Sequence, residues 1–128
     1  MKALVFNCKE VSWGQPKIDI ETKQRTSCLL VFVCCEERDS DKELKETVRR
    51  IKQLNQKRFN RKNIVIFPFA HLSNEIMQKD KAFDFISRFS SLLKNDMGIE
   101  IACLPFNQEK GVAINLLEKN EDVSFISY

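Results

Sequence analysis

Eight consecutive apolar residues, Cys28 to Cys35, constrain the fold of this chain more than any other segment. The run is too short for an independent helix and is rich in Val and Leu, so it predicts a central strand buried on both faces. Two further apolar runs follow at residues 63–67 and 100–104, and a helical pattern separates each run from the next. Crossovers within one sheet are right-handed, so these strands run parallel if they share a sheet. Their carboxyl ends then lie along one edge.

The two helices between these strands are marked by apolar spacing and by their ends. The first is predicted at about Asp41–Arg58, and Ser40 with Glu43 fits a capping box at its start. The second is predicted from about Asp80 to Gly98, because glycine readily adopts the left-handed conformation that ends a helix.

Shorter strands are predicted near both ends of the chain. Lys2–Cys8 alternates weakly, whereas Val11–Ile20 is interrupted by glycine and proline and predicts a broken edge strand or a hairpin at most. Thr22–Thr26 is polar and indicates a turn. The last two strands are predicted at Val112–Leu117 and Val123–Ile126. The order is therefore two strands, two strand-helix units and three strands.

The composition is that of one globular domain. With 128 residues, 43% of them hydrophobic and 30% charged, the chain can bury a core, so we expect residues 1–128 to form a single domain. No apolar run reaches the length of a membrane-spanning helix, and residues 1–6 are too short for a signal peptide. These features predict a cytoplasmic protein with no membrane partner.

Several kinds of site are disfavoured. There are three glycines and no Gly-x-Gly-x-x-Gly or Walker pattern, which argues against a nucleotide-binding loop. The five cysteines show no Cys-x-x-Cys spacing, and the chain has one histidine. We therefore expect reduced core thiols, no metal site and no cofactor.

The strongest motif follows the second apolar run. The segment Phe67–Ser73 contains a proline that ends the strand ladder and the only histidine, His71. A second Pro-Phe pair, Pro105–Phe106, follows the third run and leads to Lys110. Ligands of α/β sheets bind beyond the carboxyl ends of strands, so the two loops predict one shared site. On residues alone, a structural histidine and a surface lysine paired with Glu109 remain the alternatives.

A basic segment covers residues 49–62, which contain seven Lys and Arg residues and no acidic residue. It is either a solvated helix end whose cations complement the helix dipole or a phosphate-binding patch. The predicted phosphate contacts are Arg49, Arg50, Lys57, Arg58, Arg61 and Lys62.

The two Pro-Phe loops resemble a known family. Residues Ile66–Ser73 look like the aromatic-Pro-Phe-Ala-His-Leu-Ser segment of the archaeal threonyl-tRNA synthetase N-terminal editing domain. Leu104–Phe106 with Lys110 is similar to that family's later Pro-Phe loop, where a lysine follows at the same offset. The resemblance runs from Met1 to about Leu117. It implies an α/β fold of the D-aminoacyl-tRNA deacylase kind, β2-(βα)2-β3, in sheet/sheet/helix layers.

The resemblance also implies a function, the hydrolysis of L-serine wrongly attached to threonine tRNA, assisted by the terminal 2′-hydroxyl. Serine lacks only the methyl group of threonine, and one methylene supports discrimination of only about 10–200-fold, so a second, hydrolytic site is needed. The implied partners are the 3′-aminoacyl end of threonine tRNA, a synthetase catalytic domain in the same or another chain, and a second copy in a homodimer.

Roles for individual residues come from the same resemblance. His71 matches the active-site histidine and Lys110 the catalytic lysine. The implied substrate-binding residues are Pro68, Phe69, Ala70, Cys35, Phe106 and Glu109.

The chain departs from the family pattern at several positions. Glu109 stands where the family has an aromatic residue, and Asn107 stands where it has glycine. The family's functional glutamate has no clear counterpart here, and Glu118, Glu121 and Asp122 are the candidates. A freestanding D-aminoacyl-tRNA deacylase and a non-catalytic tRNA-binding or regulatory domain are therefore rival functions.

Overall fold

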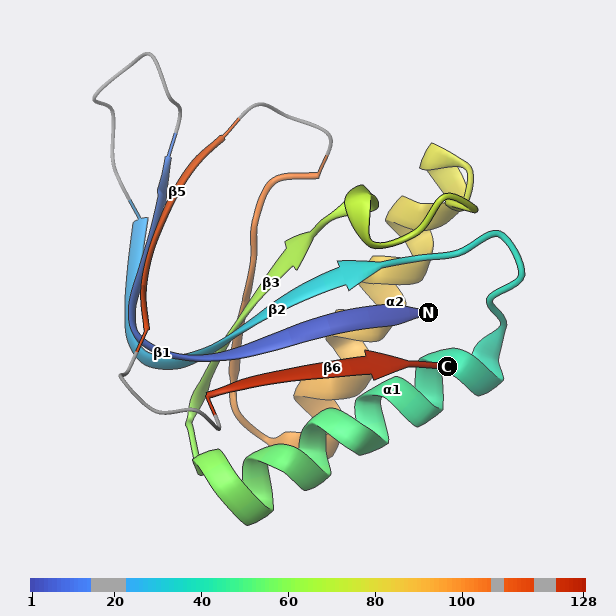
Figure 1. The fold of residues 1–128 in the computed structure, drawn as a ribbon. Helices are drawn as coiled ribbons and strands as arrows, with labels where there is room; N and C mark the ends of the chain where they lie inside the picture. The colour runs from blue at the N-terminus through green and yellow to red at the C-terminus, as the bar shows by residue number, and fades with distance from the viewer. Residues whose placement is uncertain (15–22, 107–109, 117–121) are drawn as a thin grey trace.

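One sheet and two long helices make up most of the molecule (Figure 1). The computed structural model describes residues 1–14, 23–106, 110–116 and 122–128. The elements, in chain order, are β1 (Lys2–Gly14), β2 (Lys23–Cys34), α1 (Asp41–Leu54), a π-helical turn (Asn55–Phe59), β3 (Asn63–Pro68), a 3₁₀ turn (Ala70–Leu72), α2 (Lys79–Met97), β4 (Glu100–Cys103), β5 (Gly111–Leu116) and β6 (Val123–Ser127).

The strands form one six-stranded sheet in the order β4-β3-β2-β1-β5, with β6 also paired to β1. β2, β3 and β4 are parallel, as predicted from the three apolar runs, and their carboxyl ends share one edge. The other pairs are antiparallel. β1 pairs with β6 along residues 2–6 and with β5 along residues 8–14, so its two halves have different neighbours.

The predicted layers are present, but one continuous sheet supplies both sheet layers. β1 and β2 bend sharply together (Figure 1), and their far halves fold over the face opposite the helices. Val11 and Trp13 of the bent part share a buried cluster with Val65 of β3 and with Leu104. The larger core lies on the other face, where α1 and α2 cover the sheet.

Two predictions about the first strands were wrong. Val11–Gly14 continues β1, which is paired on both sides and is not an edge strand, and Lys23–Thr26 belongs to β2 and is not a turn. The two stretches are extended because each pairs with the other across the sheet. Residues 15–20 of the predicted broken strand lie outside the described residues.

The predicted helices are confirmed with small shifts at their ends. Glu43 accepts the backbone N–H of Ser40 at 2.8 Å, which confirms the capping box of α1. The first helix was predicted to Arg58, but its α-helical part ends at Leu54 and a π-helical turn continues to Phe59. α2 ends at Gly98, which is left-handed with φ +61°. No helix in the described part of the chain is long and apolar enough to cross a membrane.

The segment after β3 is tied to the end of β2 by backbone hydrogen bonds. The N–H of Phe69 donates to the carbonyl of Val33, and the N–H of Met77 donates to that of Cys35, both at 2.9 Å. The backbones of Glu36 and Ile76 also form an isolated bridge. The loop that carries His71 is therefore fastened to a central strand at both of its ends.

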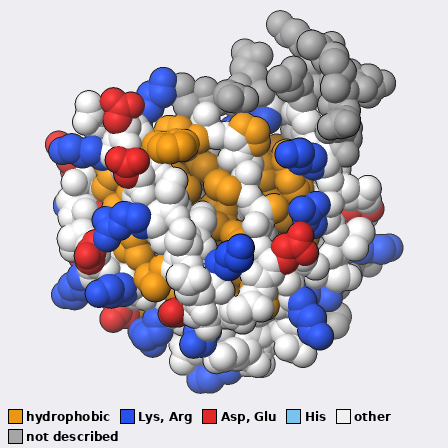
Figure 2. Space-filling view, turned by 180° about the vertical axis from the view of Figure 1, so that it is seen from behind, with side chains coloured by type: hydrophobic (Ala, Val, Ile, Leu, Met, Phe, Trp, Pro, Cys, Tyr) orange, Lys and Arg blue, Asp and Glu red, His pale blue; other side chains and the backbone are white. Residues whose placement is uncertain are grey.

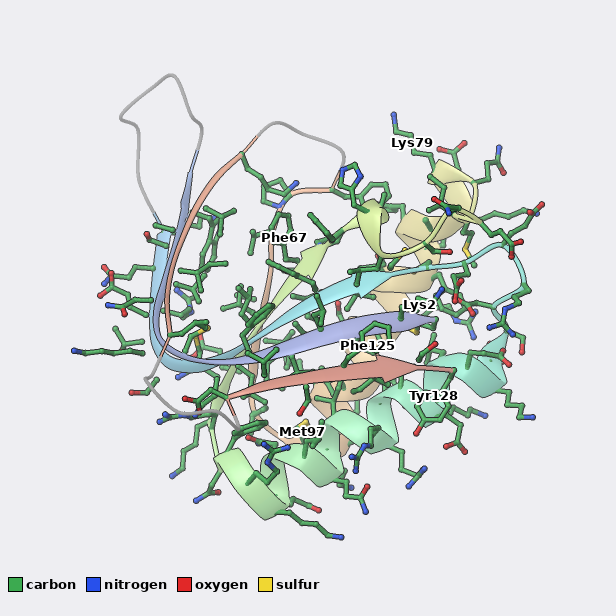
Figure 3. The ribbon with its side chains drawn as sticks, viewed as in Figure 1. Lys2, Phe67, Lys79, Met97, Phe125 and Tyr128 are labelled. Carbon is green, nitrogen blue, oxygen red and sulfur yellow. The ribbon has the colours of Figure 1, made fainter. Side chains whose placement is uncertain are left out.

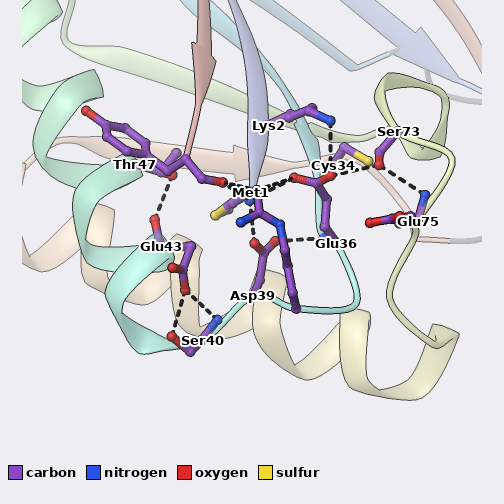
Figure 4. Close-up of polar contacts among 12 residues, drawn as sticks. Met1, Lys2, Cys34, Glu36, Asp39, Ser40, Glu43, Thr47, Ser73 and Glu75 are labelled. Atoms are coloured by element: carbon purple, nitrogen blue, oxygen red, sulfur yellow. Dashed lines mark hydrogen bonds and ion pairs between the residues drawn. The ribbon is translucent and has the colours of Figure 1, made fainter.

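The buried carboxylate of Glu36 joins this loop to the chain's N-terminus (Figure 4). Its Oε1 accepts from the Met1 ammonium at 3.2 Å, and its Oε2 accepts from Lys2 Nζ at 3.0 Å and Ser73 Oγ at 2.8 Å. Asp39 also binds the Met1 ammonium and accepts the N–H of Glu36. One carboxylate thus connects β1, β2 and the loop after β3.

The environment of Glu36 favours its charged form. Burial alone would raise the pKa of this carboxyl, but hydrogen bonds from Ser73, Lys2 and the Met1 ammonium outweigh burial and hold the pKa at about 2. The ordinary value is 4.5, so folding favours the deprotonated form. The resulting stabilisation is complete above about pH 4.5 and is lost as pH falls toward 2.

We predict that Glu36→Gln lowers the free energy of unfolding at pH 7 by about 1–3 kcal/mol, because buried donors lose a charged acceptor. Urea unfolding at several pH values measures this difference. It should shrink as pH falls from 4.5 toward 2, where the wild-type carboxylate becomes protonated. Glu37→Gln changes an exposed neighbour and should leave stability nearly unchanged. A pH-independent difference would contradict the assigned charge state.

Candidate functional site

The two predicted site loops leave the sheet at the same edge. β3 ends at Pro68 and the following 3₁₀ turn carries His71, while β4 ends at Cys103 and leads to Phe106. The N–H of Leu104 donates to the carbonyl of Ile66 at 2.8 Å, so the second loop begins beside the first. Lys110 directly precedes β5. Both loops rise from rigid strands, which fixes where their side chains point.

An aromatic row crosses this edge, made of Phe6, Phe32, Phe67 and Phe69. Phe32 lies at its centre, with ring centroids 4.8 Å from Phe67 and 5.0 Å from Phe69, the latter pair stacked. Phe67 and Phe69 also meet edge to face at 5.7 Å. The Phe67 and Phe69 rings are only partly buried. The row forms an apolar floor at the sheet edge, with Phe67 labelled in Figure 3.

Lys110 and His71 are attached to this floor. The Lys110 ammonium lies over Phe67, 5.2 Å from the ring centroid, and the His71 ring meets Phe69 edge to face at 5.1 Å. Since Phe67 and Phe69 touch each other, the two polar side chains belong to one contact chain. Partial burial lowers the pKa of Lys110, while the nearby Cys103 thiol opposes that shift.

This arrangement suits the stabilisation of developing negative charge. A half-buried ammonium held over an apolar floor is poorly screened by water and can donate hydrogen bonds to an oxyanion or a water molecule. His71 is exposed and can reach a ligand that lies on the same floor. The space above Phe67 and Phe69 is therefore the candidate position of a reacting group.

A cavity of about 190 Å³ lies beside the floor. Four predicted substrate-binding residues line it, namely Cys35, Phe69, Ala70 and Phe106. The other lining residues are Val33, Cys34, Ile76, Met77, Lys79, Ala82 and Ile86. Phe69 belongs to both the cavity wall and the aromatic row, so it links the cavity to His71. Pro68 adjoins Phe69 without lining the cavity, and Glu109 lies outside the described residues.

The cavity thiol of Cys35 is not an activated nucleophile. Burial raises its pKa to about 12, and the neighbouring Asp39 and Cys34 act in the same direction. A neutral thiol attacks esters poorly, so the cavity offers shape and not covalent chemistry. The described residues contain no group of three or more His, Cys, Asp or Glu side chains that could hold a metal ion.

Sequence reasoning missed the contributions of the segment just before α2. Ile76, Met77 and Lys79 all line the cavity, and Lys79 projects from the start of α2 (Figure 3). The sequence around these residues is short and largely polar, and it shows no motif and no strong hydrophobic periodicity. Backbone contacts with Cys35 and Glu36 bring this segment back to the end of β2, and no local pattern reveals such contacts.

Residues 55–62 of the basic segment lie at the opposite edge of the sheet, where α1 ends and β3 begins (Figure 1), whereas Arg49 and Arg50 lie within α1. The six residues of β3 separate residues 55–62 from the His71 loop, a span of about 20 Å. Arg61 also has a structural role there, because its Nε donates to Asn7 Oδ1 at 2.8 Å. Arg49 pairs with Glu46 at 2.9 Å, and Arg50 donates to Gln53 at 2.8 Å. Lys57 and Lys62 are exposed, and Arg58 donates to Ser124 at 3.2 Å.

Asp122, one of three candidates for the family's functional glutamate, is also remote from Lys110. It directly precedes β6, is buried, and accepts from Asn7 Nδ2 at 2.9 Å. Asn7 in turn contacts Arg61, so Asp122 lies near the basic segment. Glu118 and Glu121 lie outside the described residues, as does Asn107.

Comparison with known proteins gives one family match. Residues 1–117 match the model of the archaea-specific editing domain of threonyl-tRNA synthetase. The chain is 27% identical over 125 residues to a threonine–tRNA ligase of Pyrobaculum neutrophilum, covering 91% of this chain and 20% of that protein. It is 29% identical over 115 residues to the ligase of Methanococcus maripaludis, covering 88% of this chain and 18% of that protein. It thus spans about a fifth of the length of these relatives.

Two solved structures share the fold. A c-Myc DNA Unwinding Element Binding Protein matches with a TM-score of 0.80 and 16% identity, covering 100% of this chain and 99% of that chain. A probable eukaryotic D-amino acid tRNA deacylase matches with a TM-score of 0.65 and 9% identity, covering 98% and 96%. The deacylase-like fold expected from the sequence is confirmed.

Proposed function

This chain belongs to the archaea-specific editing-domain family of threonyl-tRNA synthetase, and we propose that it hydrolyses the ester between L-serine and threonine tRNA. Editing removes a wrongly attached amino acid, so the family's activity is that of an aminoacyl-tRNA hydrolase. The observation that carries the finer proposal is the position of Lys110 and His71 on one aromatic floor beside a small cavity.

In the proposed complex, the ester carbonyl lies over Phe67 and Phe69. Lys110 orients the attacking water and stabilises the oxyanion that forms, while the terminal 2′-hydroxyl of the tRNA assists the attack. His71 shapes the pocket from the other end of the contact chain. The reaction needs no covalent intermediate, in keeping with the raised pKa of Cys35.

The backbone after β3 is suited to the amino acid. Pro68 has no N–H group, and the N–H of Phe69 is used by the carbonyl of Val33. The segment therefore presents carbonyl acceptors, which match the ammonium and hydroxyl donors of serine. The apolar cavity lined by Cys35, Ala70 and Phe106 suits the terminal adenine better than the polar seryl group.

The wider context is also proposed. The relatives are longer ligases, so a synthetase catalytic domain in the same or another chain is the proposed partner, with threonine tRNA as the shared substrate.

A homodimer is proposed because the pairings of the described strands leave one edge of β6 open and its Phe125 is exposed. We place this activity in the cytoplasm with translation. The rival activity is D-aminoacyl-tRNA deacylation, which the fold shared with a probable deacylase favours.

The first prediction from the proposed function concerns selectivity between amino acids. The chain should release serine from threonine tRNA at least about 10-fold faster than threonine, because one methyl group disturbs both binding and the placement of water. Replacing the terminal 2′-hydroxyl by hydrogen should nearly abolish release. Deacylation of L-seryl-, L-threonyl- and D-aminoacyl-tRNA measures these rates. Preference for D-aminoacyl esters would support the rival deacylase, and binding without hydrolysis would support a non-catalytic domain.

The second prediction concerns Lys110 and His71. Lys110→Ala should lower kcat for seryl-tRNA by about 10²–10³-fold, the effect of losing one oxyanion donor. His71→Ala should lower it less, since this side chain shapes the pocket. Single-turnover kinetics at saturating tRNA measure both. Lys94→Ala removes an exposed lysine from the last turn of α2 and should leave the rate unchanged. Full activity of Lys110→Ala would refute the assigned mechanism.

The third prediction tests the basic segment. Replacing Lys57, Arg58 and Lys62 by Gln should weaken tRNA binding and lower the slope of log affinity against log salt by about 0.7–0.9 for each lost phosphate contact. Arg61 is retained in this variant because it holds Asn7. A control with Gln at Lys42, Lys45 and Lys94 removes the same charge elsewhere. Equal slopes for wild type and the first variant would make the segment a solvated helix end.

A further inference from the structure

An apolar groove lies between α2 and the segment after β4, and we call it the Phe83 groove. Its volume is about 440 Å³, and its walls include Phe83, Ile86, Ser87, Ser90, Cys103 and Phe106. Phe83 is 54% exposed and meets Phe106 edge to face, with ring centroids 5.6 Å apart. Figure 2 views the molecule from behind and shows hydrophobic side chains gathered on this face, with Lys and Arg side chains around them. No function described above uses this groove.

The Phe83 groove adjoins the cavity that lies beside the aromatic row. Ile86 and Phe106 line both hollows, so one ring and one aliphatic side chain form the wall between them. The cavity, at about 190 Å³, is smaller than the roughly 300–1,000 Å³ of typical ligand pockets. It has room for one small group, and the rest of a polymeric substrate must continue elsewhere. The Phe83 groove is the hollow that shares its wall.

The walls of the Phe83 groove suit a nucleobase. Two aromatic rings offer faces for stacking, which contributes to single-stranded RNA binding with little sequence preference. The hydroxyl of Ser87 donates to the carbonyl of Phe83 at 2.9 Å, and its oxygen can still accept from a base.

We propose that the Phe83 groove binds the base of the nucleotide that precedes the terminal adenosine of the tRNA. This inference rests on the proposed function, which places the terminal adenosine in the cavity. Phe106 then separates the two bases, and Phe83 supplies the outer stacking surface. The groove is an RNA subsite that positions the 3′ end and takes no part in ester hydrolysis.

The test compares a long and a minimal substrate. Phe83→Ala should raise the KM for seryl-tRNA by about 5- to 100-fold, the effect of losing one stacked base, and should leave kcat within about twofold. Hydrolysis of 3′-O-seryl-adenosine, which lacks the preceding nucleotide, should be unchanged. Phe83→Tyr should retain the wild-type KM, whereas Phe83→Leu should behave like alanine because it has no aromatic face. The control is Ile114→Ala on β5, an exposed hydrophobic side chain that lines neither hollow.

A binding experiment keeps the inference testable if no ester is hydrolysed. Phe83→Ala should weaken binding of uncharged tRNA but not of tRNA trimmed by its last two nucleotides. Equal binding of intact tRNA by wild type and variant would overturn the inference, as would equal losses for both substrates in the kinetic test. A changed oligomeric state of Phe83→Ala with unchanged tRNA binding would identify a protein interface and overturn it too. Failure of the proposed function itself appears separately, as wild-type protein that hydrolyses neither seryl-tRNA nor seryl-adenosine.

Discussion

The sheet edge that carries the candidate site depends on the contacts of one buried carboxylate, that of Glu36. It stands just beyond the central strand β2 and binds the Met1 ammonium, Lys2 and Ser73. A charge buried in this way is stable only while its partners remain in place, so the contact enforces one arrangement of these segments. The same edge carries the backbone bonds that fasten the loop of His71 to β2. The charge of Glu36 and the position of the His71 loop are therefore coupled.

The site also follows from strand direction. Because β2, β3 and β4 are parallel, the segments that leave them meet at one edge, although they are far apart in the chain. Proline at the end of β3 and again after β4 stops the ladder and turns the chain outward. The bent halves of β1 and β2 then bring β5, and with it Lys110, toward the same edge. Rigid strands, and not the loops themselves, determine where the polar side chains converge.

Much of this architecture could be predicted because its signals are local. The apolar run at Cys28–Cys35, the capping box at Ser40 and the two Pro-Phe pairs each act within a few residues. The polar start of β2 was missed because Lys23–Thr26 is extended only through pairing with residues 10–13 of β1, which no local pattern records. The cavity residues before α2 were missed for the same reason. Likewise, the charge count of residues 49–62 could not show that residues 55–62 lie at the far edge.

The separation of the basic segment from the site constrains how RNA could lie on this molecule. Phosphate contacts at Lys57 or Lys62 are about 20 Å from the His71 loop, so they cannot position the ester. Positioning must come from short-range contacts near the reacting group, which the aromatic floor, the cavity and the Phe83 groove can supply. RNA that leaves this groove and follows α2 and β4 toward the opposite edge would approach the end of α1, where the cations lie. In such an arrangement long-range charge governs encounter and salt dependence, while stacking at the 3′ end determines whether the ester reaches Lys110.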